Sequence, residues 1–330
     1  MRILVYGAGV IGSVYAAHLH RGGHDVTVLA RGRRLAEIRE HGVVAEAVFS
    51  GRRVEAPVAV VETLAPDDAY DLVLVAMQKG HLEAVLPLLA ANRCTPSVAF
   101  LGNNAAGPDP LTDALGADRV LMGFPMLGGY LDGPLVRYSS DGRDVKSLRL
   151  VLGELGGGIT PRLGAIAEAF SQADIVVDVE PHIDAWLKGH VALVVPMLFA
   201  LDRYDLDTDA LAGDRATLRL VVRAIREGLA VLKRLGLPIT PLRLRTISWL
   251  PVFVTAWIFS KIVASEYARV ALVGHARHAT AEFDLLLDEL RALASRSGLA
   301  TPALDELCVR GPASPPTSTP SGRDGDARPR

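Results

Sequence analysis

Residues 1–34 read MRILVYGAGVIGSVYAAHLHRGGHDVTVLARGRR, and this stretch decides the fold. An apolar run leads into glycines at Gly7, Gly9 and Gly12, and a helical pattern follows over residues 10–22. A G-x-G-x-x-G motif between a strand and a helix is typical of a dinucleotide-binding turn. We therefore predict a Rossmann-type unit here, with a glycine turn that holds no nucleotide as the alternative.

Each glycine has an expected role in binding a pyrophosphate. Gly7 permits the tight turn, Gly9 lets the backbone approach the phosphates, and Gly12 lets the helix pack on its strand. The free N–H groups at the helix N-terminus would bind the phosphates. The predicted cofactor-binding residues of this turn are Gly7, Ala8, Gly9, Val10, Ile11 and Gly12.

The residue after the second strand indicates which dinucleotide binds. An NAD site usually has an acidic residue about 20 positions after the glycines, where it binds the ribose 2′-hydroxyl. This chain has Arg31 at that place, followed by Arg33 and Arg34. Because a guanidinium would bind the 2′-phosphate, we predict NADP(H) as cofactor and Arg31 as a binding residue. Solvated arginines at a strand end are the alternative.

Composition and charge are typical of a globular protein of about two domains. Of the 330 residues, 50% are hydrophobic and 22% are charged, and the formal net charge is −2. This balance argues against a broad basic surface for nucleic acid. Cys94 and Cys308 lack the spacing of a disulfide framework or a cysteine metal motif, so we expect a cytoplasmic protein.

Apolar runs alternate with helical patterns in the first half of the chain, whereas long helical patterns dominate after Pro181. Continuous runs such as 71–77 are typical of strands covered on both faces in a doubly wound parallel sheet. Residues 43–61 predict a hairpin that turns at Gly51. We predict an α/β Rossmann domain over 1–180, an all-α domain over 181–309 and a disordered tail over 310–330.

Two apolar segments, 190–201 and 247–259, raise the question of a membrane. Each is shorter than the roughly 20 residues that a helix needs to cross a bilayer, and each contains a proline. We expect both to be buried helices. A membrane-associated protein that uses 247–259 is the alternative.

The glycine turn, the arginine after the second strand and the helical second half resemble the ketopantoate reductase (2-dehydropantoate 2-reductase) family over about residues 1–308. The likeness is strong in ILVYGAGVIGSVYAAHL and VTVLARGRR and moderate in FLGNNAAG. The resemblance implies a cytoplasmic oxidoreductase that reduces a 2-keto acid with NADPH in pantothenate biosynthesis. It also implies a second domain that is helical, of the 6-phosphogluconate dehydrogenase C-terminal type.

The resemblance assigns roles to particular side chains. DAWLKGH is similar to the family's Trp-x-Lys segment, which implies Lys188 as the catalytic proton donor, and AEFD is similar to its Glu-Ile-Asp segment, which implies Glu282 as a catalytic, substrate-binding residue. Asn103 would bind the nicotinamide or the substrate, and Lys79 could bind the substrate carboxylate. For each the alternative is structural: a surface or capping lysine, a solvated helix face, or a loop-capping Asn.

Some positions depart from the family pattern, in segments where we expect the substrate. Gln78 stands where a lysine is usual, Ala192 replaces an asparagine, and Val195 replaces the asparagine of an Asn-Pro pair. The resemblance therefore implies the fold and the cofactor, and it leaves the identity of the keto acid open. A reductase of another keto acid, and an NADP-binding sensor without turnover, are the alternatives.

His275, His278 and Glu282 would share one face of a helix, a spacing that could hold a metal. No HExxH motif or cysteine ligand accompanies them, so we predict no metal and a helix face turned toward the substrate. The predicted partner is a small 2-keto acid, with no nucleic acid or membrane. The apolar load of the helical half also allows a homodimer.

Overall fold

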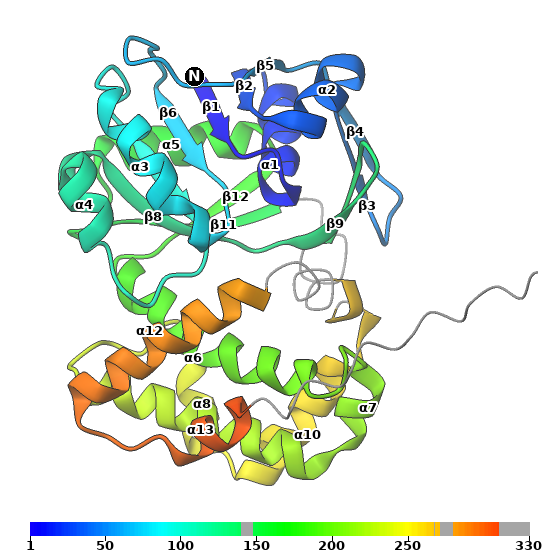
Figure 1. The fold of residues 1–330 in the computed structure, drawn as a ribbon, viewed down its shortest axis with the longest axis vertical. Helices are drawn as coiled ribbons and strands as arrows, with labels where there is room; N and C mark the ends of the chain where they lie inside the picture. The colour runs from blue at the N-terminus through cyan, green and yellow to red at the C-terminus, as the bar shows by residue number, and fades with distance from the viewer. Residues whose placement is uncertain (140–147, 267, 271–279, 310–330) are drawn as a thin grey trace, which may run out of the picture.

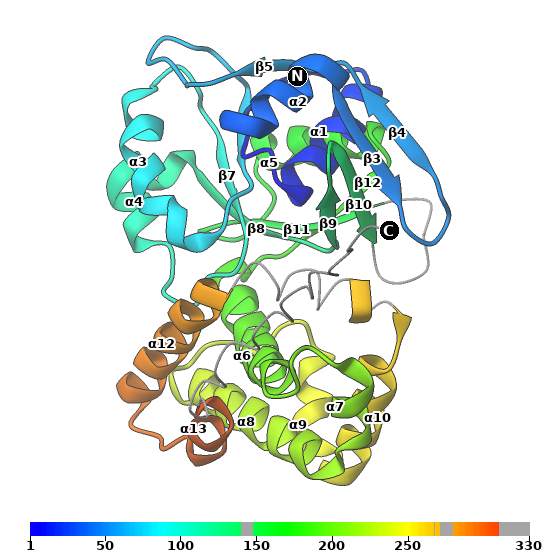
Figure 2. The same cartoon turned by 45° about the vertical axis from the view of Figure 1, so that its right-hand side comes forward.

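The computed structural model describes residues 1–139, 148–266, 268–270 and 280–309. Sheets with covering helices form one region from the first part of the chain, and helices from the last part form a second region beside it (Figure 1). The same two regions are distinct when the molecule is turned (Figure 2).

An eight-stranded, mostly parallel sheet forms the centre of the first region, in the order β12-β11-β8-β7-β6-β1-β2-β5. The strands from β5 to β8 are parallel and follow the doubly wound order of dinucleotide-binding folds, whereas β11 runs antiparallel to β8. The predicted fold class is confirmed. The strands are β1 (Arg2–Tyr6), β2 (Asp25–Leu29), β5 (Ala59–Val61), β6 (Leu72–Val75), β7 (Val98–Leu101), β8 (Val120–Pro125), β11 (Leu148–Glu154) and β12 (Ile175–Val179).

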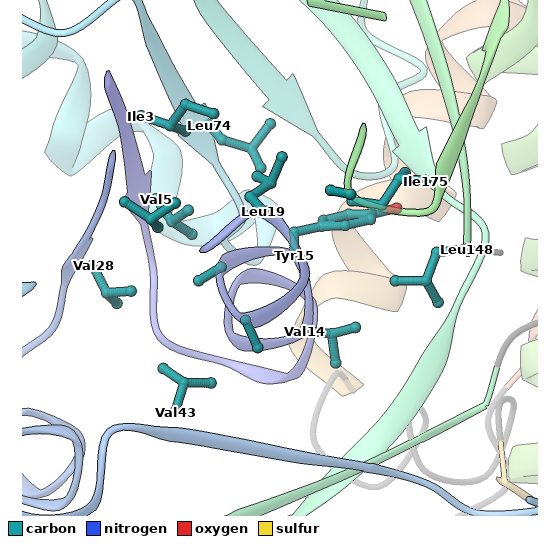
Figure 3. Packing of buried hydrophobic residues seen from close by; sticks show 14 of the residues in the cluster. Ile3, Val5, Val14, Tyr15, Leu19, Val28, Val43, Leu74, Leu148 and Ile175 are labelled. Carbon is teal, nitrogen blue, oxygen red and sulfur yellow. The ribbon is translucent and has the colours of Figure 1, made fainter. Parts of the chain in front are cut away.

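Helix α1 is fixed to this sheet by its buried side chains. Tyr15 and Leu19 lie among Ile3, Val5 and Leu74 of the strands (Figure 3), and all five are fully buried. Burying each aliphatic side chain contributes about 1.5–3 kcal/mol. The helices and 3₁₀ turns of this region are α1 (Val10–Arg21), α2 (Gly32–His41), η1 (Lys79–His81), α3 (Leu82–Ala91), α4 (Asp109–Leu115), η2 (Ala117–Arg119) and α5 (Pro161–Gln172).

A second, four-stranded sheet has the order β4-β3-β10-β9. Its strands are β3 (Val43–Ala47), β4 (Arg53–Ala56), β9 (Gly128–Asp132) and β10 (Leu135–Ser139). The hairpin predicted over 43–61 is confirmed for β3 and β4, which pair antiparallel around a turn in which Gly51 has a φ of +68°, whereas Ala59–Val61 belongs to the main sheet as β5. Local patterning did not predict that β10 would pair with β3 in parallel, because that partner is distant in the sequence.

The helical region has its own hydrophobic core, in which α6 is the central helix. By length and composition α6 could cross a membrane, but 78% of its most apolar window is buried in the fold, so the prediction of a buried helix at 190–201 is confirmed. Gly298, with a φ of +70°, follows the last residue of α12. The helices are α6 (Ile183–Asp202), α7 (Thr208–Gly213), α8 (Arg215–Arg234), α9 (Leu244–Trp249), α10 (Val252–Val263), α12 (Thr280–Ser297) and α13 (Pro302–Cys308).

The prediction of a buried helix over 247–259 is wrong in part. The segment is broken before Pro251, and Trp249, Phe253 and Trp257 are 81%, 63% and 61% exposed. Proline lacks the N–H that would continue the helix, so α10 begins anew after it. The buried side chains of α10 lie on its other face, toward the core: Thr255, Ala256, Phe259 and Val263.

The secondary structure changes near Pro181, since β12 ends at Val179 and α6 begins at Ile183. The first turns of α6 nevertheless pack into the sheet region, where Trp186 and Leu187 share a hydrophobic cluster with strand residues. The division into domains 1–180 and 181–309 therefore stays a prediction. The predicted tail 310–330 lies outside the described residues.

Candidate functional site

The glycine turn joins β1 to α1, and each of its glycines has a different environment. Gly7 has a φ of +116°, and a Cβ on Gly12 would lie 1.9 Å from the Gly7 carbonyl oxygen. A Cβ on Gly9 would meet nothing within 4 Å. Gly7 and Gly12 are therefore required by the backbone itself, whereas Gly9 faces open space at the N-terminus of α1. This arrangement fits a pyrophosphate.

The arginines after β2 differ in what they contact. Arg34 donates to the Ala8 carbonyl oxygen at 3.1 Å and to Ser13 Oγ at 3.2 Å, and these hydrogen bonds stabilise the glycine turn. Arg31 has an exposed side chain whose Nε donates to the Glu62 carbonyl oxygen at 3.4 Å. The structure thus leaves the Arg31 guanidinium exposed to solvent at the carboxyl end of β2.

The predicted residues Lys79, Asn103, Lys188 and Glu282 come together where the main sheet meets the helical region. Asn103, in the loop after β7, has its Nδ2 3.5 Å from Glu282 Oε1 of α12. Lys188 and Glu282 are 5% and 7% exposed. Burial lowers the pKa of Lys79, and the nearby charges of Glu282 and Lys188 also act on that pKa. Four side chains that are far apart in the sequence therefore form one polar cluster.

Lys188 lies against the loop that follows β7. Its ammonium pairs with Asp184, one turn earlier on α6. A Cβ on Gly107 would lie 3.4 Å from Lys188 Nζ, and Gly107 has a φ of +103°. Glycine tolerates this backbone conformation and lets the loop come close to the ammonium. Lys188 is thus held beside the segment that carries Asn103.

Lys79 has a different partner from the one that the sequence suggested. Its Nζ lies 2.5 Å from Glu289 Oε1 and donates to Asn104 Oδ1 at 2.8 Å. The side chains of Lys79 and Glu289 are 13% and 11% exposed. The ion pair with Glu289 opposes the lowering of the Lys79 pKa by burial. In this structure Lys79 binds a carboxylate of the protein itself.

Glu289 is a residue of this site that the sequence analysis missed. Its Oε2 accepts hydrogen bonds from the backbone N–H groups of Ala105 at 2.9 Å and Ala106 at 3.1 Å. One carboxylate of α12 therefore holds both Lys79 of η1 and the loop after β7. Glu289 lies seven residues after Glu282, on the same helix face, and this spacing is the signal that could have found it.

Asn103 offers an atom that a ligand could bind. Its side chain is buried, and its Oδ1 has no hydrogen-bond partner within the part of the chain that the structure describes. Leaving a buried acceptor unpaired costs about 1–3 kcal/mol. A donor group on a bound cofactor or substrate would remove this cost. Asn103 and the open position at Gly9 are the observations that fit a dinucleotide.

The residues that depart from the family pattern have separate surroundings. Ala192 and Val195 are fully buried in the core of the helical region, and a Cβ on Gly228 of α8 would lie 2.9 Å from the Ala192 Cβ. Gln78 precedes η1. The structure thus gives Ala192 a packing role between α6 and α8.

The metal alternative rests on residues that the structure covers only in part. His275 and His278 lie outside the described residues. No group of His, Cys, Asp or Glu that could hold a metal ion occurs in the segments 1–139, 148–266, 268–270 and 280–309.

Comparison with known sequences finds similarity to one family of reductases. Residues 3–146 match the model of the ketopantoate reductase PanE/ApbA family. An uncharacterized oxidoreductase, YkpB of Bacillus subtilis (strain 168), is 29% identical over 197 residues, which are 57% of this chain and 61% of the relative. The 2-dehydropantoate 2-reductase of Archaeoglobus fulgidus is 28% identical over 211 residues, 61% of this chain and 64% of the relative. The match thus spans less than two thirds of either relative.

Solved structures share the fold over nearly the whole chain. The 2-dehydropantoate 2-reductase from Geobacter metallireducens GS-15 has a TM-score of 0.75 at 20% identity, covering 93% of this chain and 98% of that one. A D-mandelate dehydrogenase with NADH and anilino(oxo)acetate has a TM-score of 0.75 at 20% identity, covering 93% and 96%. Such identities carry the fold alone. The family model matches only the first part of the chain, so these comparisons show that the chain shares the NAD(P)-binding fold of these oxidoreductases and that residues 3–146 are similar to the ketopantoate reductase family.

Proposed function

We propose that this protein reduces a 2-keto acid with NADPH, and that ketopantoate, reduced to pantoate for pantothenate biosynthesis, is the first substrate to test. The observation that carries the proposal is the buried cluster of Lys188, Glu282 and Asn103. The cluster lies beside the loop after β7, at the carboxyl edge of the sheet where doubly wound folds bind their ligands.

The reaction needs a hydride, a proton and groups that stabilise the developing charge. Bound NADPH would supply the hydride. Lys188 Nζ would donate a proton to the substrate oxygen, and Glu282 would accept a hydrogen bond from the hydroxyl that forms. Because Lys188 pairs with Asp184 in this structure, the substrate oxygen must share or replace that contact. Asp184 would then keep the ammonium in place between turnovers.

The substrate carboxylate needs a cation, and Lys79 would bind it only if Glu289 released the Lys79 ammonium. Glu289 already lies 2.5 Å from its ammonium. A substrate carboxylate at Lys79 would bring a second negative charge close to Glu289, which would oppose binding.

The test is consumption of NADPH with ketopantoate and identification of the product by mass spectrometry. Replacing Lys188 with Ala should lower kcat by about 10²–10⁴-fold, the usual contribution of a general acid. Lys233→Ala, which removes an exposed lysine of α8, is the matched control and should leave the rate unchanged. A wild-type rate in the Lys188→Ala variant would exclude Lys188 as the proton donor.

A panel of other 2-keto acids separates the remaining alternatives. Phenylglyoxylate belongs in it, because a D-mandelate dehydrogenase shares the fold. Turnover of a different acid at a higher kcat/KM would reassign the substrate and keep the chemistry. Tight NADPH binding with no turnover of any acid would favour an NADP-binding sensor.

The preference for NADPH is proposed from Arg31 alone. Its exposed guanidinium at the end of β2 would bind the 2′-phosphate. NADPH should bind more tightly than NADH, and Arg31→Ala should bring the two dissociation constants close together. Arg296→Ala, which removes an exposed arginine of α12, should leave their ratio unchanged. Tighter binding of NADH by the wild type would overturn this preference.

A further inference from the structure

The carboxylate of Glu289 is held in the way that a bound ligand would be held. Its Oε1 lies 2.5 Å from Lys79 Nζ, and its Oε2 accepts the backbone N–H groups of Ala105 at 2.9 Å and Ala106 at 3.1 Å. Successive backbone N–H groups that point at one anion form a recurrent anion-binding arrangement, and an ammonium adds a full positive charge. We call Lys79 Nζ and these two N–H groups the anion site. Its donors all come from the sheet region, whereas the carboxylate comes from α12.

The shape of the anion site does not depend on Glu289. Asn104 Nδ2 donates to the Gly107 carbonyl oxygen at 3.0 Å, and the Gly107 N–H donates back to Asn104 Oδ1 at 3.0 Å. Lys79 Nζ donates to the same Oδ1 at 2.8 Å. These hydrogen bonds hold the loop and the ammonium from within the sheet region. The donors would therefore stay in position when Glu289 left the site.

The anion site is next to the place where the proposed reaction would occur. Lys79 and Asn103 line the same cavity, and the Oδ1 of Asn103 has no hydrogen-bond partner among the described residues. Burial lowers the pKa of Lys79, and the charges of Glu282 and Lys188 also act on it, so the ammonium lies within electrostatic range of both. The rest of the cavity wall is largely apolar: Met77, Leu82, Phe100, Leu101, Leu111 and Met122. A small acid in this cavity could place its carboxylate at Lys79 and its keto oxygen near Asn103.

We propose that the anion site binds the carboxylate of the substrate, and that Glu289 is an internal carboxylate which the substrate displaces. The identity of the ligand rests on the proposed reduction of a 2-keto acid. The charge conflict at Lys79 disappears, because the two carboxylates bind in turn rather than together. An internal competitor lowers the apparent affinity according to the fraction of molecules in which the site is free. Glu289 therefore sets the affinity for the substrate without touching the reacting atoms.

The first test uses oxamate, an analogue of a 2-keto acid that accepts no hydride, titrated by calorimetry into the NADPH complex of the full chain. Glu289→Gln keeps the size of the side chain and an acceptor for the N–H groups but removes the charge. It should bind oxamate about 10-fold or more tightly than the wild type, because the competitor is weaker. Asp288→Asn, which neutralises the exposed neighbour on the same helix, is the matched control and should bind oxamate as the wild type does.

Two results of this titration would overturn the proposal. Unchanged or weaker oxamate binding by Glu289→Gln would show that Glu289 is only a structural link between α12 and the loop. A gain in the affinity for NADPH instead of oxamate would assign the anion site to a phosphate of the cofactor.

The second test asks whether an external carboxylate can replace the internal one. Glu289→Ala removes a group of about the size of acetate, so acetate should raise the midpoint of thermal unfolding of this variant above its value in chloride at the same concentration. The wild type, whose site is occupied, should not distinguish the two salts. The double variant Lys79→Met and Glu289→Ala lacks the ammonium and should lose the effect of acetate. Equal midpoints of Glu289→Ala in acetate and chloride would contradict an anion site.

Activity separates this proposal from the proposed function. If 2-keto acids are reduced, Glu289→Gln should lower their KM about 10-fold or more with a smaller change in kcat, because the removed contact competes with binding rather than with the chemical step. A raised KM would exclude displacement. Tighter binding of oxamate by Glu289→Gln without reduction of any keto acid would keep the anion site and reject the reductase activity.

Discussion

Gly9 and Gly12 belong to one motif but are constrained by different contacts. Alanine at position 12 would place its Cβ 1.9 Å from the Gly7 carbonyl oxygen, whereas alanine at position 9 would meet no atom within 4 Å. Gly12→Ala should therefore lower the free energy of unfolding by about 3 kcal/mol or more, as overpacking does. Urea denaturation measures this loss.

The free energy of unfolding of Gly9→Ala should lie within about 1 kcal/mol of the wild-type value, because there is room for its methyl group. It should weaken NADPH binding about 10-fold or more, because that room is where the pyrophosphate would approach. Fluorescence titration of NADPH measures the affinity. Wild-type affinity in Gly9→Ala would show that the phosphates do not contact this turn.

The Lys79–Glu289 pair is largely buried, and its loss should be costly. Glu289→Ala leaves the ammonium and the N–H groups of Ala105 and Ala106 without their acceptor. Removing one partner of a buried pair costs about 3–5 kcal/mol. The double variant Lys79→Met and Glu289→Ala should lose less than the sum of the two single losses. Additive losses in a double-mutant cycle would contradict a direct interaction.

At the scale of elements, Asp214 is the N-cap of α8 and stabilises the first turn of that helix. The carboxylate accepts backbone N–H groups of Ala216 and Thr217 at 2.8 and 3.1 Å, and the Tyr204 hydroxyl donates to it. The Tyr204 hydroxyl and the Thr217 N–H lower the pKa of Asp214 to about 2. Asp214→Ala should therefore destabilise the protein by about 1 kcal/mol near neutral pH, the usual value of an N-cap.

The pH dependence of that loss follows from the direction of the pKa shift. Because the folded pKa lies below the ordinary value, the stabilisation is fully present above that value and is lost as pH falls toward about 2. The free energies of unfolding of the wild type and the Asp214→Ala variant should therefore differ at neutral pH and become equal in acid. Urea titrations at several pH values measure the difference, and a constant gap down to the acid limit would contradict the capping role.

Two apolar helices show how far composition predicts burial. The segments 190–201 and 247–259 are similarly hydrophobic, and we expected both to be buried. α6 is surrounded by other helices and by the sheet, whereas one side of α10 has no covering element in the described structure. The hydrophobicity of a segment indicates how much free energy its burial would contribute, but the position of neighbouring elements decides whether the segment is buried.

At the scale of the whole molecule, a ligand that binds only the folded chain must stabilise it. NADPH at about 100 times its dissociation constant should add about 2.7 kcal/mol to the free energy of unfolding. NADH at the same concentration should add less if Arg31 binds the 2′-phosphate. Thermal unfolding with each nucleotide measures both effects, and equal shifts would contradict the proposed preference.

The sequence by itself determined the elements whose partners are close along the chain. The strand, glycine turn and helix of residues 2–21 and the hairpin β3–β4 were predicted. They follow from local chemistry, since the glycines permit conformations that other residues resist and apolar periodicity marks the face that packs. The family resemblance added Lys188, Glu282 and Asn103 as matched positions.

Only the tertiary structure decided which distant residues meet. Glu289 joins Lys79 to the loop after β7, β10 joins β3, and the aromatic rings of α10 stay outside the core. Each of these contacts joins segments that are far apart in the sequence. Bringing such segments together costs loop-closure entropy, and the pattern of neighbouring residues does not show which distant segments repay that cost. The sequence therefore predicted the turn that would hold a dinucleotide, whereas the ion pair that occupies Lys79 became visible only in the folded chain.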